Sequence, residues 1–191
     1  MTNVPPALER NGDFSESLFT RPFAPQLGGR FPGDVIPVFF QNPVGRAIAN
    51  LYPLPNRDVP FQNYVSPPNR VDDADVVDVR VDEQVNPAVR LTGRYSFADR
   101  RLFEPFSGPA FPSVPGYGTY IDSRAQNLST AATAILSPAL VNELRVGYTR
   151  LENATDHENR GTSVNGAVGL PELSANERDF GLSYITISGF S

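Results

Sequence analysis

The sequence predicts an all-β fold, in which antiparallel strands of a transmembrane β-barrel are joined by long loops and accompanied by one short helix. Residues 76–98 and 126–151 each alternate apolar and polar side chains with the period of two that a β-strand requires. Each arm of the first stretch is about ten residues long, which suits a tilted strand that crosses a bilayer. Tight turns also alternate with long connections at 100–124 and 152–182, as they do in outer-membrane barrels.

The composition narrows the possible functions. A length of 191 residues suits one domain or a large part of one, and the 19 prolines and 15 glycines indicate many loops. The net charge is −5 and all 16 basic residues are arginines without a basic cluster, so no nucleic-acid partner is expected. The absence of cysteine excludes a disulfide scaffold and any cysteine-based metal site or nucleophile. No apolar run is long enough for a transmembrane helix.

Residues 1–75 form a loop-rich segment. Turn residues dominate it, for example at 11–13, 28–29 and 32–34, and no periodic pattern is sustained. Aromatic side chains are its expected packing points, namely Phe14, Phe19, Phe23 and Phe31.

One short helix is expected within this segment, at residues 42–52. Asn42 can cap its first turn, and Pro43 suits the first helical position. Pro53 ends it. Because the helix is only about three turns long, tertiary contacts must hold it. Its expected inward face consists of Val44, Ala47, Ile48 and Leu51.

The first hairpin is expected at 76–98, with its turn at Asn86-Pro87-Ala88. Its two faces differ strongly. One is apolar and aromatic and consists of Val77, Val79, Val81, Val89, Leu91, Gly93, Tyr95 and Phe97. The other contains the charged residues Asp78, Arg80, Asp82, Arg90 and Arg94.

The second hairpin is expected at 126–151, with its turn at Ser137-Pro138-Ala139. Its first arm alternates more weakly because its apolar positions are mainly alanine. Its second arm places Leu140, Leu144, Val146 and Tyr148 on one face. Residues 152–191 are expected to form an extracellular-type loop followed by the start of a further strand at 184–190.

Two environments fit these faces. In a barrel, the apolar face meets lipid and the polar face lines a wet lumen, where Arg80, Arg90, Arg94 and Arg145 are expected to pair across strands with Asp78, Asp82 and Glu143. Tyr95, Phe97 and Tyr148 then fall near the outer strand ends, where an aromatic girdle belongs. Alternatively, in a soluble sandwich or a sheet over a helix, the Val/Leu/Tyr face packs a core. The barrel predicts one common exposed face for Val79, Val81, Leu91, Tyr95, Leu144, Val146 and Tyr148.

No constellation of residues points to catalysis or to a cofactor. The acidic run Asp72, Asp73, Asp75 and Asp78 lacks the spacing and the glycine of a calcium loop, so a solvated start of the strand is the better interpretation. His157 is the only histidine, and even with Asp156 and Glu158 beside it one histidine gives a poor metal site. No Gly-x-Ser-x-Gly elbow is present, and we expect no enzyme.

The aromatic residues of 103–120 could contact a ligand outside the cell, but packing within the loop is the simpler expectation. They are Phe103, Phe106, Phe111, Tyr117 and Tyr120. Ligand-binding residues are not assigned from the sequence.

Several segments resemble, in the same order, those of large TonB-dependent outer-membrane receptors from the branch with a carboxypeptidase-regulatory-like domain ahead of the plug. They are ERNGDFSES at 9–17, FPGDVIP at 31–37, NPVGRAIANLYPLPN at 42–56, VDVRVDEQVNPAVRLTGRYSFAD at 77–99, SPALVNELRVGYTR at 137–150 and GLPELSANERDFGLSYITISGFS at 169–191. The resemblance implies a barrel of about 22 strands in the cell outer membrane, filled by a plug and driven by TonB. Such receptors import large or scarce ligands, often metal chelates or glycans.

We expect only a fragment of such a barrel. The chain shows no signal peptide, TonB box or plug, and four full strands with the start of a fifth fall short of the eight that the smallest barrels need. The expected partners are outer-membrane lipid, the missing plug and remaining barrel strands, and the TonB complex through the parent protein. The fragment alone is not expected to transport. The alternative is a secreted or surface β-rich module for ligand binding or adhesion, stable in water.

Overall fold

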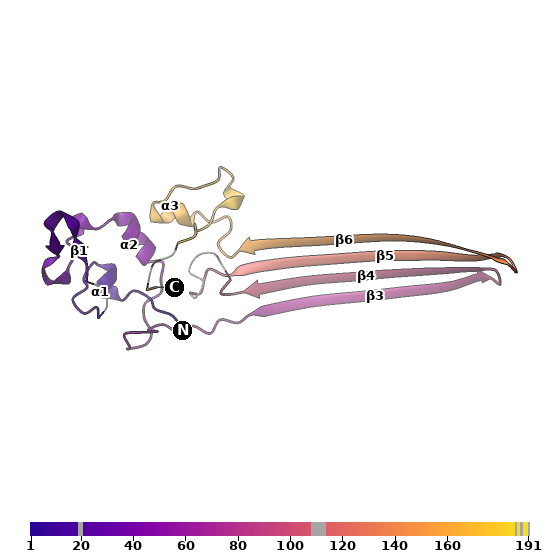
Figure 1. The fold of residues 1–191 in the computed structure, drawn as a ribbon, viewed down its shortest axis with the longest axis horizontal. Helices are drawn as coiled ribbons and strands as arrows, with labels where there is room; N and C mark the ends of the chain where they lie inside the picture. Colours follow the sequence, from indigo (N-terminus) through magenta and orange to yellow (C-terminus); the bar gives the residue numbers. More distant parts are fainter. Residues whose placement is uncertain (19–20, 108–113, 186, 188, 191) are drawn as a thin grey trace. The chain divides into compact units, whose positions relative to one another are not determined.

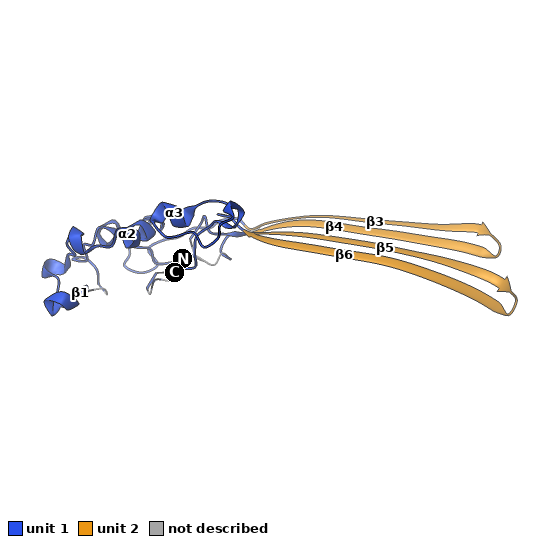
Figure 2. Cartoon of the chain, turned by 90° about the horizontal axis from the view of Figure 1, so that it is seen from above, with its two compact units in different colours: residues 1–69, 105–119, 157–191 blue, residues 70–104, 120–156 orange. Residues whose placement is uncertain are grey.

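The computed structural model describes residues 1–18, 21–107, 114–185, 187, 189 and 190. The chain divides into two compact units (Figure 2). The strand unit comprises residues 70–104 and 120–156, and the loop unit comprises residues 1–69, 105–119 and 157–191. No helix in the described part of the chain has the length and apolar character needed to cross a membrane.

The strand unit is a four-stranded sheet in the order β3-β4-β5-β6 (Figure 1). Its strands are β3 (Val71–Asn86), β4 (Val89–Glu104), β5 (Thr119–Ser137) and β6 (Leu140–His157). Strands β3 and β4 are antiparallel, and the sheet order follows the chain as in an up-and-down barrel wall. The all-β prediction is confirmed.

The strands are longer than the sequence predicted. They contain 16, 16, 19 and 18 residues, roughly 50–60 Å at the usual strand rise. The expected hairpins at 76–98 and 126–151 therefore extend at their open ends, and the expected loops at 100–124 and 152–182 are wrong by several residues. Alternation fades beyond Phe97 because charged side chains occupy both faces there, although backbone pairing continues from Ala98 to Phe103.

Both tight turns form where the sequence placed them. Asn86 Oδ1 accepts a hydrogen bond of 2.8 Å from the backbone N–H of Ala88, and Ser137 Oγ accepts one of 3.3 Å from that of Ala139. Such side-chain bonds to the backbone two residues on are typical of Asn and Ser in turns. All four strands are thus joined as two hairpins with two-residue connections.

The loop unit contains the short helices α1 (Ala7–Arg10), α2 (Pro43–Ala49) and α3 (Val164–Val168) and the paired strands β1 (Phe23–Ala24) and β2 (Gly29–Arg30). Helix α2 is shorter than the expected 42–52 and has Asn50 as its C-terminal cap. The predicted N-terminal cap is confirmed, since Asn42 Oδ1 accepts from the N–H groups of Val44 at 2.8 Å and Gly45 at 3.2 Å.

The core of the loop unit joins residues from distant parts of the chain. Val4, Tyr52 and Val114 are its buried members. Partly buried neighbours surround them, namely Ile48, Leu51, Tyr64, Tyr117, Leu182, Ile185, Ile187 and Phe190. Arg10 donates hydrogen bonds to the carbonyl oxygens of Pro5 at 2.9 Å and Tyr52 at 2.8 Å, and also to that of Pro53. The three sequence segments of this unit therefore share one small core.

The aromatic packing points predicted for residues 1–41 are only partly correct. Phe31 is buried, with its ring 5.5 Å from that of Phe40, and Phe14 is half-buried. Phe23 is exposed, so its prediction is wrong, because the two-residue strand β1 turns its ring away from the buried side chain of Ala24. Phe19 lies outside the described residues.

The strand expected to start at 184–190 is not found among the described residues of that stretch. Ile187 and Phe190 form one isolated antiparallel bridge, and their side chains pack against the loop-unit core instead of entering the sheet. Thr186 and Ser188 lie outside the described residues.

Replacing Asn42 by Ala tests the cap of α2. Loss of the two capping bonds should cost the helix about 1 kcal/mol, and thus raise local opening roughly five-fold. Hydrogen exchange at the amide of Asn50, which bonds to the carbonyl of Arg46 at 3.0 Å, measures that opening. Asn42→Ser is the control and should exchange at the wild-type rate; equal rates in Asn42→Ala would contradict the capping role.

Tyr52 gives a second test, of the loop-unit core. Burial, with a smaller contribution from Tyr117, raises the pKa of Tyr52 to about 12. In the unfolded chain a tyrosine ionises near pH 10, so the stabilisation is complete below pH 10 and is lost as pH rises from 10 to 12. Burial also raises the pKa of Tyr117. An ultraviolet titration of tyrosinate should therefore show a late ionisation near pH 12 that Tyr52→Phe removes and Tyr117→Phe leaves in place. The control Tyr184→Phe, whose ring is exposed, should leave it in place.

Candidate functional site

The two faces of the β3–β4 hairpin are chemically different along most of its length. One face, here called the apolar face, contains the cross-strand pairs Val77–Phe97, Val79–Tyr95 and Val81–Gly93. The other, here called the polar face, contains the pairs Asp78–Ser96, Arg80–Arg94 and Asp82–Thr92. Because side chains alternate along a strand, this register also fixes the face on which each remaining paired residue of the hairpin lies.

The apolar face continues across all four strands. One shallow hollow is lined by residues of all four strands, and Glu83 is the one charged residue among them. They are Val81, Glu83, Leu91, Thr92, Gly93, Thr130, Ala131, Ala132, Leu144 and Val146. The large side chains of the apolar face are exposed, including Val79 at 50%, Val81 at 61% and Leu144 at 65%. Leu91, Tyr95, Val146 and Tyr148 are exposed as well. The register and the shared hollow place Val79, Val81, Leu91, Tyr95, Leu144 and Val146 on one face, and alternation along β6 adds Tyr148, as predicted.

No closed core covers this face. Among the described residues of the strand unit, Leu102 is the only buried apolar side chain, and it belongs to the polar face near the open end of the hairpin. A contiguous apolar surface across four strands is unusual for a soluble monomer and marks a protein or membrane contact. The described residues therefore contain no soluble core built on this face.

The polar face is a network of ion pairs and hydrogen bonds. Asp78 accepts hydrogen bonds from Arg94, at 3.1 Å, and from Ser96. On β5 and β6, Asn127 donates to Thr149 Oγ1 at 2.7 Å. Ser123 donates to Asn153 Oδ1 at 2.8 Å. Polar groups of this face thus satisfy one another across neighbouring strands without an opposite wall.

The expectation that all its arginines pair across strands needs correction. Arg94 does so with Asp78, but Arg80 pairs with Asp82 at 2.7 Å and Arg145 with Glu143 at 2.9 Å, two residues along the same strand. Arg80 lies directly opposite Arg94, so a carboxylate on its own strand is the nearer partner. Arg90 lies opposite Gln84 and not opposite an acid.

The side of the sheet that carries the apolar face changes in chemical character along the strands. Beyond the valines and leucines come the aromatic residues Tyr95, Phe97 and Tyr148, followed by charged side chains. We call these charged residues the charged band; they are Asp73, Asp75, Asp99, Arg101, Asp122, Arg124, Arg150 and Glu152.

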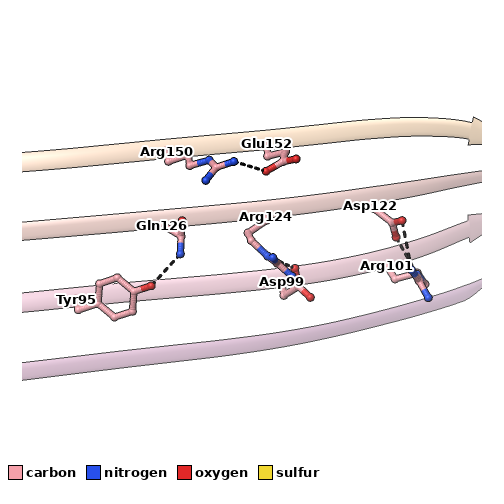
Figure 3. Close-up of polar contacts among 8 residues, drawn as sticks. All are labelled: Tyr95, Asp99, Arg101, Asp122, Arg124, Gln126, Arg150 and Glu152. Atoms are coloured by element: carbon pink, nitrogen blue, oxygen red, sulfur yellow. Dashed lines mark hydrogen bonds and ion pairs between the residues drawn. The ribbon is translucent and has the colours of Figure 1, made fainter.

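Three ion pairs organise the charged band (Figure 3). Arg101 of β4 pairs with Asp122 of β5 at 2.8 Å, and Arg124 of β5 pairs with Asp99 of β4 at 2.9 Å. Arg150 pairs with Glu152 within β6, also at 2.9 Å. This band was not predicted from the sequence, because residues 100–124 were expected to form a loop. The signal was present as charges at every second position, at 99 and 101, 122 and 124, and 150 and 152.

The aromatic row and the charged band are in direct contact. The guanidinium carbon of Arg124 lies 5.7 Å from the centroid of the Phe97 ring, within cation–π range. Gln126 donates a hydrogen bond of 3.1 Å to the Tyr95 hydroxyl (Figure 3). The change from apolar to charged surface is therefore sharp, within about two residues of each strand.

The acidic run at the start of β3 does not converge on one point. Asp72 and Asp78 belong to the polar face, whereas Asp73 and Asp75 belong to the opposite face, because the run lies on a single strand. Asp72 pairs with Arg100 at 2.6 Å. Within the described residues, no group of three or more His, Cys, Asp or Glu side chains could hold a metal ion.

The aromatic residues of 103–120 are distributed over both units. Phe103 and Tyr120 lie on β4 and β5, with ring centroids 4.8 Å apart, so they belong to strands and not to a loop. Tyr117 packs against the loop-unit core, and Phe106 is exposed. Phe111 lies outside the described residues.

A comparison with protein families decides between membrane and partner protein as the contact of the apolar face. The model of the family described as "Outer membrane beta barrel domain" matches residues 1–191, the whole chain. The chain belongs to this family. No solved structure matches it.

Membership of the outer-membrane barrel family assigns an environment to each face of the sheet. The apolar face meets lipid in the outer membrane, and the polar face lines the barrel interior. From Val77 to Val85 the outward positions of β3 span about nine residues, with Glu83 as the one charged residue among them, close to the 9–11 that a tilted strand needs to cross. The sheet has four strands in an open order, fewer than the eight of the smallest barrels, so it is part of a barrel wall.

An arginine at mid-height of the apolar face tests this placement. Val146→Arg should destabilise the protein in the outer membrane by about 2–4 kcal/mol, because the charge enters hydrocarbon. The control Ser129→Arg adds the same side chain at a similar height on the interior face and should cost little. Urea unfolding in bilayers measures both; an equal cost for the two variants would contradict the assignment of faces.

Proposed function

We propose that the chain is part of the barrel of a TonB-dependent receptor, and that the parent protein imports a large or scarce ligand across the outer membrane. The observation that carries this proposal is the ordered set of receptor-like segments from 9–17 to 169–191. The proposal assigns the chain a transport role and no catalysis. It makes the TonB complex a partner of the parent protein and a plug the occupant of the interior.

The interior face supports a wide barrel. In eight-stranded barrels the interior is just wide enough for side chains to fill it, whereas 22-stranded transporters enclose a plugged lumen. Here the long side chains of Arg80, Arg94 and Arg145 each pair with a neighbouring carboxylate on the same wall. The arginines of such a wall need no partner from an opposite wall, so the wall suits contact with water or with a polar plug.

The arrangement of the loop unit supports the proposal that the parent protein captures a ligand outside the cell. Its segments 1–69, 105–119 and 157–191 connect to the strand ends opposite the two-residue turns. In outer-membrane barrels the short turns face the periplasm and the long connections face outward. A unit with its own small core, built from these connections, can hold a binding surface outside the membrane.

A surface-exposed binding or adhesion module stable in water is the competing function. The exposed apolar face of β3–β6 counts against it, because such a face should associate in water. Purification separates the two proposals: a monomer that melts cooperatively without detergent would favour the soluble module.

Coupling to TonB is tested in cells that make the natural protein. Antibodies against this chain should precipitate TonB together with the protein after formaldehyde cross-linking, because an energised receptor contacts TonB directly. An abundant outer-membrane porin provides the control and should bring down none. Recovery of the protein from the outer membrane without TonB, in cells depleted of iron or of glycans, would contradict the transport proposal and leave barrel membership intact.

A further inference from the structure

On the apolar face of the sheet, Glu83 is the one charged residue between the turns and the aromatic row. It lies directly opposite Leu91 of β4, and the next residues on its side of β3 are Val81 and Val85. The side chain is exposed, and its carboxylate has no hydrogen-bond or ion-pair partner among the residues that the structure describes. An ionisable side chain on a lipid-facing surface is costly, so it points to a partner of opposite charge.

Glu83 also lines the shallow hollow of the apolar face. Valine and leucine side chains of β3 and β6 border this hollow, and small residues lie between them, namely Gly93 of β4 and Thr130 and Ala132 of β5. A Cβ atom added at Gly93 would meet no atom within 4 Å, so the space above that residue is open. Neighbouring strands lie about 4.8 Å apart, so small residues on two adjacent strands leave a trough that can hold an acyl chain. The hollow is thus an apolar trough with a carboxylate at its border.

The position of Glu83 along β3 brings its carboxylate near the periplasmic headgroups. In outer-membrane barrels the short turns face the periplasm. Val85, the last outward position of the crossing, lies two residues nearer the turn, which is about 5 Å along a tilted strand. A glutamate side chain spans most of that distance. Glu83 can therefore contact the headgroup of a periplasmic-leaflet lipid whose acyl chain occupies the hollow.

We propose that the hollow and Glu83 together bind phosphatidylethanolamine of the periplasmic leaflet, with an acyl chain in the hollow and the lipid ammonium at the carboxylate. The ammonium donates N–H bonds to Glu83, a charge-assisted contact that is stronger in the low dielectric beside the hydrocarbon. The residues that line the hollow include no arginine or other cation, so the site selects the ammonium of the lipid and not its phosphate. This inference rests on barrel membership and is independent of transport.

The test compares phosphatidylethanolamine with phosphatidylcholine of the same acyl chains, because the choline nitrogen carries the same charge but has no N–H to donate. Native mass spectrometry of the natural protein in a maltoside detergent measures binding of both lipids. The wild type should bind phosphatidylethanolamine about three-fold or more tightly, and E83Q should reduce that ratio to about one. The control E16Q removes a carboxylate from an exposed position of the loop unit and should keep the wild-type ratio.

A second variant separates the role of the hollow from that of the carboxylate. G93V places a side chain in the open space of the hollow without a collision. It should weaken the binding of both lipids about equally, by roughly two-fold or more, and leave their ratio unchanged, because it removes room for the acyl chain that both lipids share.

A third arm needs no variant and decides the question if E83Q does not fold. The N-methyl and N,N-dimethyl derivatives of phosphatidylethanolamine should bind the wild type with affinities that decline stepwise toward that of phosphatidylcholine, since each methyl group removes a donor. A wild-type ratio near one would overturn the proposal, and is expected if a cation of the strand beside β3 neutralises Glu83 instead. An unchanged ratio in folded E83Q, or unchanged affinities in G93V, would overturn it as well. None of these outcomes bears on TonB coupling.

Discussion

Cross-strand register is the constraint on which the strand unit depends. The pairing of Val79 with Tyr95 and of Arg80 with Arg94 commits every side chain of β3 and β4 to one of two faces. A slip of one residue would move the valines to the interior and the charges into lipid, at a cost of several kcal/mol. The two-residue turns, each closed by an Asn or Ser side chain, prevent that slip. Ion pairs then form only where the register allows them.

The second determinant is the change of solvent along each strand. Near the turns the outward side chains meet hydrocarbon and are apolar except for Glu83; at Tyr95 and Tyr148 they reach the interface; beyond them they are charged. The interior side is mainly polar, with Val76 and Leu102 among its apolar exceptions. One strand therefore passes through three environments on its outer side and a single one on its inner side.

Much of the strand unit follows from the sequence, because hydrocarbon on one side and polar surroundings on the other impose a strict alternation on residues 77–97. Beyond Phe97 both faces of the strand carry charges, alternation no longer distinguishes a strand from a loop, and the predicted strand ends fell short. The partners of Arg80 and Arg145 were missed for a related reason: a long side chain reaches two residues along its own strand as easily as across it. In the loop unit the Asn42 cap was predictable, being local. The contact of Tyr52 with Phe190 was not, since it depends on distant segments.

The central claim is that β4 has a lipid-facing side that ends at the aromatic row. Spin labels placed singly at each position from 89 to 101 of the membrane-embedded protein test it most directly. Accessibility to dissolved oxygen should peak at odd positions up to Phe97, and accessibility to a water-soluble nickel reagent should dominate at 99 and 101. Oxygen accessibility without a period of two, or a peak that continues through Arg101, would contradict the account.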